Sequence, residues 1–147
     1  MPSIYLDTCC LQRPLDDQTQ PRIRVETEAV LGILVAVQAG EVQMFSSDAL
    51  DYEISRIPDY QRRQQARSML SLAATRLNIT EAAENLAESL ERQGIRPMDA
   101  IHLALASVAG ADFFATCDRR FLARARQSTG LGCSPLSVFE LLLEISP

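Results

Sequence analysis

The stretch PMDAIHLALASVAGADFFATCDRRF, residues 97–121, decides the fold that we predict for this chain. Pro97 suits the first position of a helix, because proline has no N–H group to bond there, and Gly110 suits the end of that helix. The apolar run 113–116 that follows is typical of a buried strand, and it leads directly to Asp118. The stretch therefore predicts a helix, a tight turn and a strand that ends near a carboxylate.

Strands alternate with helices along the rest of the chain. The first strand is predicted at residues 3–6, where the apolar run IYL leads into Asp7. Further strands are expected at residues 42–45, 77–79 and 131–133, and further helices at residues 21–39, 46–56, 59–74, 80–93, 119–127 and 135–145. The segment LQRPLDDQTQ, residues 11–20, is predicted to be a polar loop. The alternation predicts one domain, residues 1–147, with a three-layer α/β sandwich around a mostly parallel sheet.

The charged residues exclude several classes of enzyme. The formal net charge of −5 argues against a protein that binds nucleic acid through bulk charge alone. All 14 basic residues are arginine, so P-loop, Schiff-base and phosphoacyl-enzyme chemistries that need a lysine are ruled out. A single histidine, His102, and the lack of a GxSxG motif leave little basis for a Ser-His-Asp hydrolase.

Hydropathy and cysteine content indicate a soluble, cytoplasmic protein. No apolar run reaches the roughly 18 residues of a membrane span, and no signal pattern opens the sequence. The four cysteines form no CxxC pair, which argues against a zinc site. We therefore expect Cys9, Cys10, Cys117 and Cys133 to be small buried side chains in a reducing compartment.

Three aspartates lie at the ends of predicted elements. Asp7 and Asp118 each follow an apolar strand, and the carboxyl ends of parallel strands are where sites form in α/β sheets. Asp99 lies in the first turn of the helix that begins at Pro97. For each aspartate alone, the competing interpretation is capping of a turn or helix, or attraction to the positive helix end.

Helical geometry selects Glu53 as a fourth acid. The apolar residues of its predicted helix lie on one face and comprise Leu50, Ile54 and Ile57. Glu53 lies beside that face, whereas Asp48 and Asp51 point away from it into solvent. A carboxylate held against the interior is costly unless another group pairs with it. His102 shares a helical face with Asp99, but a core histidine with one hydrogen bond is the favoured interpretation there.

Four carboxylates on separate segments suit a divalent cation. Close carboxylates resist joint ionisation unless a cation lies between them. Mg²⁺ and Mn²⁺ prefer oxygen ligands, and such ions activate water for attack on a phosphodiester. The acids therefore indicate a magnesium or manganese site with hydrolytic chemistry.

The chain resembles the PIN-domain ribonucleases, including the VapC-type toxins of bacterial toxin–antitoxin pairs. The stretches that carry the resemblance are YLDTC, SSDALDYE, PMDAIHLALASVAGADFFATCDRRF and SPLSVFELL, and they extend over nearly the whole chain. The resemblance implies that Asp7, Glu53, Asp99 and Asp118 are both the metal ligands and the catalytic residues, with Thr8 and Thr116 in support. It also implies a Mg²⁺- or Mn²⁺-dependent endoribonuclease that hydrolyses single-stranded RNA, with a cognate antitoxin as partner.

Some residues depart from the family pattern or allow two interpretations. Cys9 stands where a small polar residue is common in the family. The arginines of the loop region, Arg13, Arg22 and Arg24, bind RNA phosphates in one interpretation and are surface residues in the other, which we favour slightly. Glu26 either supports the metal cluster or pairs with an arginine in the core.

Two alternatives to a ribonuclease stay open. One is a degenerate PIN domain that binds RNA or protein without cutting, and the other is a different magnesium phosphohydrolase, which the absence of lysine disfavours. The nearly all-apolar helical segment 30–39 additionally predicts a homodimer, with subunits that contact each other through this helix.

Overall fold

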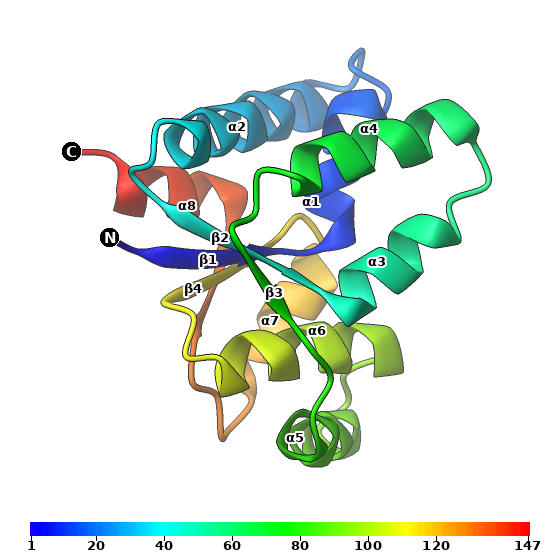
Figure 1. Cartoon of the computed structure of the whole chain (residues 1–147), viewed down its shortest axis with the longest axis vertical. Coiled ribbons are helices and arrows are strands. Elements are labelled where there is room, and N and C mark those ends of the chain that lie inside the picture. The colour runs from blue at the N-terminus through cyan, green and yellow to red at the C-terminus, as the bar shows by residue number, and fades with distance from the viewer.

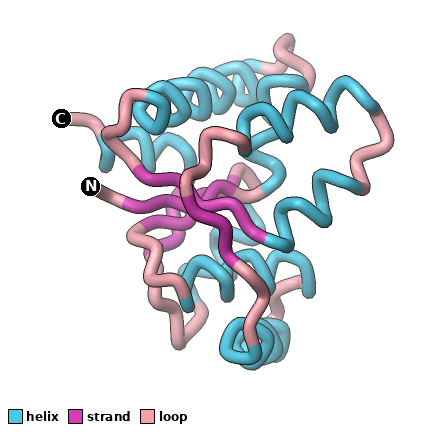
Figure 2. Tube along the Cα trace, in the orientation of Figure 1, coloured by secondary structure: helices cyan, strands magenta, loops and turns pink.

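A computed structural model describes all residues from 1 to 147 and contains a five-stranded sheet. The strands are β1 (Ser3–Leu6), β2 (Gln43–Ser47), β3 (Thr75–Leu77), β4 (Phe113–Thr116) and β5 (Ser134–Ser137). They are all parallel and lie in the order β3-β2-β1-β4-β5. The strands form the middle layer, with helices on both sides, which confirms the predicted α/β sandwich (Figure 2).

Eight α-helices surround the sheet. They are α1 (Thr8–Gln12), α2 (Pro21–Gln38), α3 (Asp48–Ser55), α4 (Tyr60–Leu70), α5 (Glu81–Arg92), α6 (Pro97–Val108), α7 (Arg119–Gln127) and α8 (Val138–Ile145), and a 3₁₀ turn (Arg13–Leu15) follows α1. Helices α2 and α8 lie on one side of the sheet, and α5 and α6 lie on the other (Figure 1). None of these helices is both long and apolar enough to cross a membrane.

The two central strands, β1 and β4, bring distant parts of the chain together. Tyr5 pairs with Phe114 and Leu6 pairs with Ala115 in a parallel register, and all four residues are buried. The rings of Tyr5 and Phe114 stack with their centroids 5.4 Å apart. Burial of each large apolar side chain contributes roughly 1.5–3 kcal/mol. Strand pairing and core packing therefore hold the carboxyl ends of β1 and β4 side by side.

The first difference from the predicted elements is α1, which begins inside the expected strand-to-loop junction. Asp7 caps this helix, because its Oδ1 atom accepts a hydrogen bond from the N–H of Cys10 at 3.3 Å. The segment 11–20 was predicted as a polar loop, but residues 11–15 continue α1 and form the 3₁₀ turn. Five residues are too few to show a helical period in the sequence.

Both edge strands lie a few residues from their predicted positions. Strand β5 begins at Ser134 rather than at 131, so Pro135 belongs to an edge strand, where a missing N–H is tolerated, and not to the last helix. That helix begins after Ser137, which forms a capping box with Glu140. Strand β3 ends at Leu77 rather than 79, and the N–H of Ile79 bonds to Asp48 instead of to the sheet.

Candidate metal centre

The four predicted carboxylates all line one pocket at the carboxyl edge of the sheet. The pocket has a volume of about 90 Å³ and is lined by Asp7, Thr8, Cys9, Glu53, Asp99, His102 and Asp118. Asp7 follows β1, Glu53 lies on α3, Asp99 lies in the first turn of α6, and Asp118 precedes α7. The structure thus brings together acids that are up to 111 residues apart in the sequence.

Asp7 is the most deeply buried of the four acids, with 5% of its surface exposed. Its backbone N–H bonds to the carbonyl of Ala115 at 3.2 Å, which fixes it against β4. The thiol of Cys9 donates to the Asp7 carboxylate, with the sulfur 2.7 Å from Oδ1. Burial, together with the neighbouring Cys9, raises the pKa of Asp7 well above its ordinary value. An ionised Asp7 therefore needs a positive charge close by.

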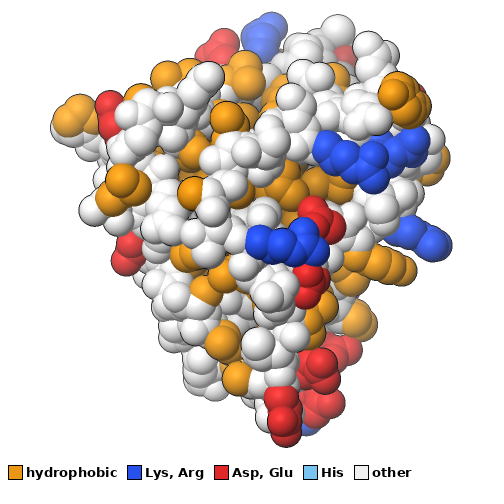
Figure 3. All heavy atoms as spheres, in the orientation of Figure 1, with side chains coloured by type: hydrophobic (Ala, Val, Ile, Leu, Met, Phe, Trp, Pro, Cys, Tyr) orange, Lys and Arg blue, Asp and Glu red, His pale blue; other side chains and the backbone are white.

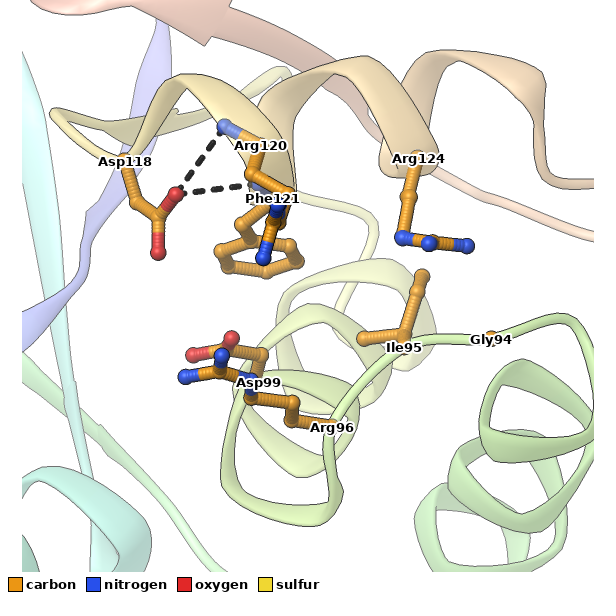
Figure 4. A pocket seen from close by; sticks show the side chains of 8 residues that line it. All are labelled: Gly94, Ile95, Arg96, Asp99, Asp118, Arg120, Phe121 and Arg124. Carbon is orange, nitrogen blue, oxygen red and sulfur yellow. Dashed lines mark hydrogen bonds between the residues drawn. The ribbon is translucent and has the colours of Figure 1, made fainter.

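Asp118 combines the two roles that the sequence left as alternatives. Its Oδ1 atom accepts hydrogen bonds from the N–H groups of Arg120 and Phe121, at 3.0 and 3.1 Å, and so caps α7. Figure 4 shows that its other carboxylate oxygen points away from the α7 backbone. One oxygen thus orients the side chain while the other stays open to the pocket.

Asp99 experiences both burial and the charge of Asp118. Burial is the larger cause and the Asp118 carboxylate the second, and together they raise the pKa of Asp99. The carboxylates therefore repel one another when no cation is near, as expected for a site that binds one.

Glu53 is held in place by a chain of buried side chains. The Nε2 atom of His102 lies 2.6 Å from Glu53 Oε1, and its Nδ1 atom lies 2.6 Å from the hydroxyl of Tyr5. Since the carboxylate can only accept, Nε2 carries the proton and Nδ1 accepts from Tyr5. The Tyr5 oxygen then accepts from the Ser47 hydroxyl, at 2.7 Å. Ser47 in turn caps α3, which carries Glu53.

This chain also sets the charge of Glu53. Burial alone would raise the pKa of Glu53, but hydrogen bonds from His102 and from the Thr8 hydroxyl outweigh it and lower the pKa. Glu53 therefore ionises more readily than an ordinary glutamate, whereas Asp7 and Asp99 ionise less readily than an ordinary aspartate. The structure shows that the favoured interpretation of His102 was incomplete, because this buried residue has two hydrogen bonds and also lines the pocket.

The donor atoms of the pocket fit a hard divalent ion. Four carboxylates and the Thr8 hydroxyl present oxygen. Both ring nitrogens of His102 are engaged with Glu53 and Tyr5, and the Cys9 thiol is engaged with Asp7. Oxygen donors without a free nitrogen suit Mg²⁺ or Mn²⁺ better than Zn²⁺. We find no such fit for Asp48 and Asp51, which lie outside the pocket and pair with Arg76.

Three thiols lie close together at the pocket, and one of them, that of Cys9, lines it. The sulfur atoms of Cys9, Cys10 and Cys117 lie within 4.8 Å of one another, and those of Cys10 and Cys117 are 3.8 Å apart. All four cysteines are free, and Cys10 and Cys117 are buried as predicted, whereas Cys9 and Cys133 are only half-buried. The convergence of the three thiols depends on the pairing of β1 with β4, which no spacing in the sequence reveals.

The arginines near the N-terminus belong to the structure rather than to the pocket. Glu26 is buried and pairs with Arg13 and Arg22, with a nitrogen–oxygen distance of 3.3 Å in each pair. This observation confirms the interpretation of Glu26 as a core partner of arginine. Arg24 lies exposed on α2.

A second pocket adjoins the first and shares Asp99 and Asp118 with it. Its volume is about 140 Å³, and its lining comprises Gly94, Ile95, Arg96, Asp99, Asp118, Arg120, Phe121 and Arg124 (Figure 4). The arginines of this pocket were not predicted from the sequence. The pair Arg119-Arg120 directly after Asp118 was the one local signal of a basic group beside the acids.

The family model of the PIN domain matches residues 4–127, which is most of the chain. This chain belongs to the PIN-domain family. No curated protein shows significant similarity to it. Among solved structures, the chain is similar to VapBC2 from Rickettsia felis, solved bound to a DNA fragment from their promoter, with a TM-score of 0.58 and 12% identity, over 92% of this chain and 98% of that one.

The fold is also similar to that of PAE2754 from Pyrobaculum aerophilum. The TM-score is 0.57 and the identity 14%, over 98% of this chain and 96% of that one. At such low identity these likenesses show the fold alone. They confirm the resemblance on which the family prediction rested.

Proposed function

We propose that this PIN domain is a Mg²⁺- or Mn²⁺-dependent endoribonuclease that hydrolyses phosphodiester bonds of single-stranded RNA in the cytoplasm. The observation that supports this most directly is the convergence of Asp7, Glu53, Asp99 and Asp118 from four elements into one pocket. Metal-dependent nuclease activity is typical of the family to which the chain belongs.

Each acid has a distinct part in the proposal. Asp7 and Asp99 are the main ligands, because burial leaves their charges most in need of a cation. Glu53 and Asp118 complete the cluster, and hydrogen bonds orient each of them, from His102 to Glu53 and from the α7 backbone to Asp118. When bound, the divalent ion supplies an activated water and neutralises charge that develops on the phosphate.

The protein side chains prepare this chemistry without forming a covalent bond to the substrate. His102 and Thr8 keep Glu53 ionised and fixed in direction. Asp7 gives up its proton when a cation enters, so cation binding and proton release are coupled at this residue.

The experiment that tests the function compares three proteins: the intact chain, Asp7→Asn and the control Asp17→Asn. Asp17 is an exposed acid outside the pocket. Manganese binding is measured by calorimetry, and cleavage is measured on labelled single-stranded RNA. We expect binding and cleavage in the intact chain and the control and neither in Asp7→Asn. If Asp7→Asn keeps both activities, the assignment is wrong.

RNA binding and turnover of a simple phosphate ester, measured on the same proteins, separate the alternative functions. A chain that binds manganese and RNA but leaves the RNA intact would be a degenerate PIN domain that acts by binding. Turnover of simple phosphate esters without RNA cleavage would instead indicate a different phosphohydrolase.

We further propose two protein partners. The similarity to the VapBC2 complex suggests an antitoxin, which would make this chain the toxin of a type II toxin–antitoxin pair. The second partner is another copy of the chain. Helix α2 exposes Leu31 and Val35, and α8, which packs against α2, exposes Leu143. Such exposed apolar side chains suit a homodimer.

A further inference from the structure

Three arginines beside the candidate metal centre form no ion pair within the protein, although Arg96 lies near Asp99 and its charge opposes the rise in the pKa of that carboxylate. Arg96 immediately precedes α6, and Arg120 and Arg124 lie on α7. All three are exposed and none forms an ion pair, whereas Arg13, Arg22, Arg62, Arg76 and Arg126 each pair with an acid. Like charges gathered without partners repel one another, so the group suits an anion from outside.

The three arginines line one pocket that continues from the acids. Figure 4 shows Asp99 and Asp118 toward one end of this pocket and Arg124 toward the other, with the α6 start and α7 facing each other across it. Ile95 and Phe121 are buried and form its apolar base. We call this site the arginine pocket.

The backbone of the arginine pocket is shaped to admit Arg124. Gly94 has a positive φ of 97°, and a Cβ atom built there would lie 2.6 Å from Nη1 of Arg124. The guanidinium group therefore lies directly over a position that only glycine leaves open. Gly94 thus leaves room for Arg124 to lie along the pocket, at the end away from the acids.

The charges around the pocket limit where a polyanion can pass. The exposed acids of α5 include Glu81, Glu84, Glu88 and Glu91, and acidic side chains gather over this helix in the lower part of Figure 3. An RNA strand that approaches the carboxylate cluster along α5 would be repelled by these negative charges. The arginine pocket is the cationic surface that directly adjoins the cluster.

We propose that the arginine pocket binds the backbone phosphate next to the scissile phosphodiester and so positions RNA across the acids. The proposal rests on the proposed function, in which the scissile phosphate lies at the carboxylates. Arginine suits the role because its planar fork binds phosphate oxygens bidentately and its face stacks on an unpaired base. Arg96, Arg120 and Arg124 are therefore positioning residues rather than catalytic ones.

The test uses two triple variants with the same change in charge. Arg96→Gln/Arg120→Gln/Arg124→Gln removes the arginine pocket. Arg67→Gln/Arg92→Gln/Arg119→Gln is the control, since these arginines are also exposed and unpaired but lie outside the pocket, and Arg119 precedes Arg120 on the same helix. Circular dichroism confirms that both variants are folded.

Binding is measured by fluorescence anisotropy at several salt concentrations, with Ca²⁺ in place of Mg²⁺ and a labelled single-stranded RNA of about 12 nucleotides. We expect the pocket variant to bind roughly tenfold or more weakly. The slope of log K against log salt should fall by about 0.7 for each phosphate group that the variant no longer binds. The control should match the intact chain, and inorganic phosphate should compete with RNA only weakly if the pocket reads a continuous strand.

Cleavage kinetics give an independent readout. With Mn²⁺, the pocket variant should show a raised KM and a kcat close to that of the intact chain, as expected for residues that position RNA without acting on the reacting atoms. Equal affinities and equal salt slopes for the two triple variants would overturn the proposal, as would an intact chain that binds no RNA. An intact chain that binds RNA through these arginines but never cuts it would contradict the proposed function alone.

Discussion

The Tyr5 hydroxyl connects the central strand of the sheet to the candidate metal centre. It lies between Ser47 and the Nδ1 atom of His102, and His102 contacts Glu53. Burial is the main reason that the pKa of Tyr5 is raised, so this hydroxyl stays protonated and donates. Through these two hydrogen bonds, the Tyr5 hydroxyl of β1 fixes His102 and so the position of the Glu53 carboxylate on α3.

We expect Tyr5→Phe to lower the free energy of unfolding by about 1–3 kcal/mol, because Ser47 and His102 would lose a buried partner. Urea denaturation measures the loss. Tyr52→Phe is the matched control, since that ring is 52% exposed. If the two variants are equally stable, the hydrogen-bond chain contributes nothing to the fold.

The raised pKa of Asp7 predicts how the metal-free protein responds to pH. Its folded-state pKa lies above the ordinary aspartate value of 3.8, so the folded chain binds more protons than the unfolded chain between the two values. Stability should therefore fall as pH rises through that window. Asp99 shifts in the same direction and adds to the effect.

Asp7→Asn removes this titration and should raise the melting temperature of the chelated protein at neutral pH. Thermal denaturation in the presence of a chelator, from about pH 5 to pH 8, gives the slope of melting temperature against pH. Added Mn²⁺ should stabilise the intact chain and leave the variant unchanged. Identical slopes for both chains would show that ionisation of Asp7 does not cause the loss of stability at higher pH.

At the scale of elements, α7 depends on a residue that also faces the pocket. Asp118→Ala should cost about 1 kcal/mol of stability through the lost N-cap, whereas Asp118→Asn should cost only a few tenths, because asparagine caps equally well. Both variants should lose manganese affinity, which separates capping from ligation. Calorimetry and urea denaturation make the two measurements, and Thr80→Ala, the corresponding cap of α5, controls for capping alone.

The elements that the sequence predicted best are those with strong local signals. Pro97 and Gly110 bracket α6 as predicted. Helices α3 and α5 lie within their predicted ranges, and Ser47 and Thr80 cap them. Helix α1 could not be predicted, because it is too short to show a period and its cap, Asp7, is equally suited to be a ligand. Pro135 suits a helix start by residue type, although it lies in an edge strand.

At the scale of the whole molecule, the features that could be predicted are those that depend on local sequence patterns. The four acids were found because each lies at an end of its own element or beside an apolar stripe. The arginine pocket depends instead on the approach of the α6 start to α7, and the thiol cluster depends on the β1–β4 pairing. Such contacts are tertiary and leave no pattern in the sequence.

The proposed homodimer is also a property of the whole molecule. Val35 is 63% exposed on α2, and Leu143 is 75% exposed on the adjacent α8. We expect light scattering to give a dimer at micromolar concentration and Val35→Glu to give a monomer, because a buried charge at an interface is costly. Val108→Glu, on α6, is the control and should remain dimeric. A monomeric intact chain would contradict the proposal.

Hydrogen bonds within the protein orient three of the four carboxylates: Asp7 and Asp118 through helix caps and Glu53 through His102. Asp99 is placed by its position in the first turn of α6. The site is therefore formed before the ion binds, unlike that of a zinc finger, which unfolds when its ion is removed. Dialysis against a chelator should yield an empty but intact protein. Different ions could then be added to this protein in turn, and the measured affinities would reflect ion binding without a contribution from refolding.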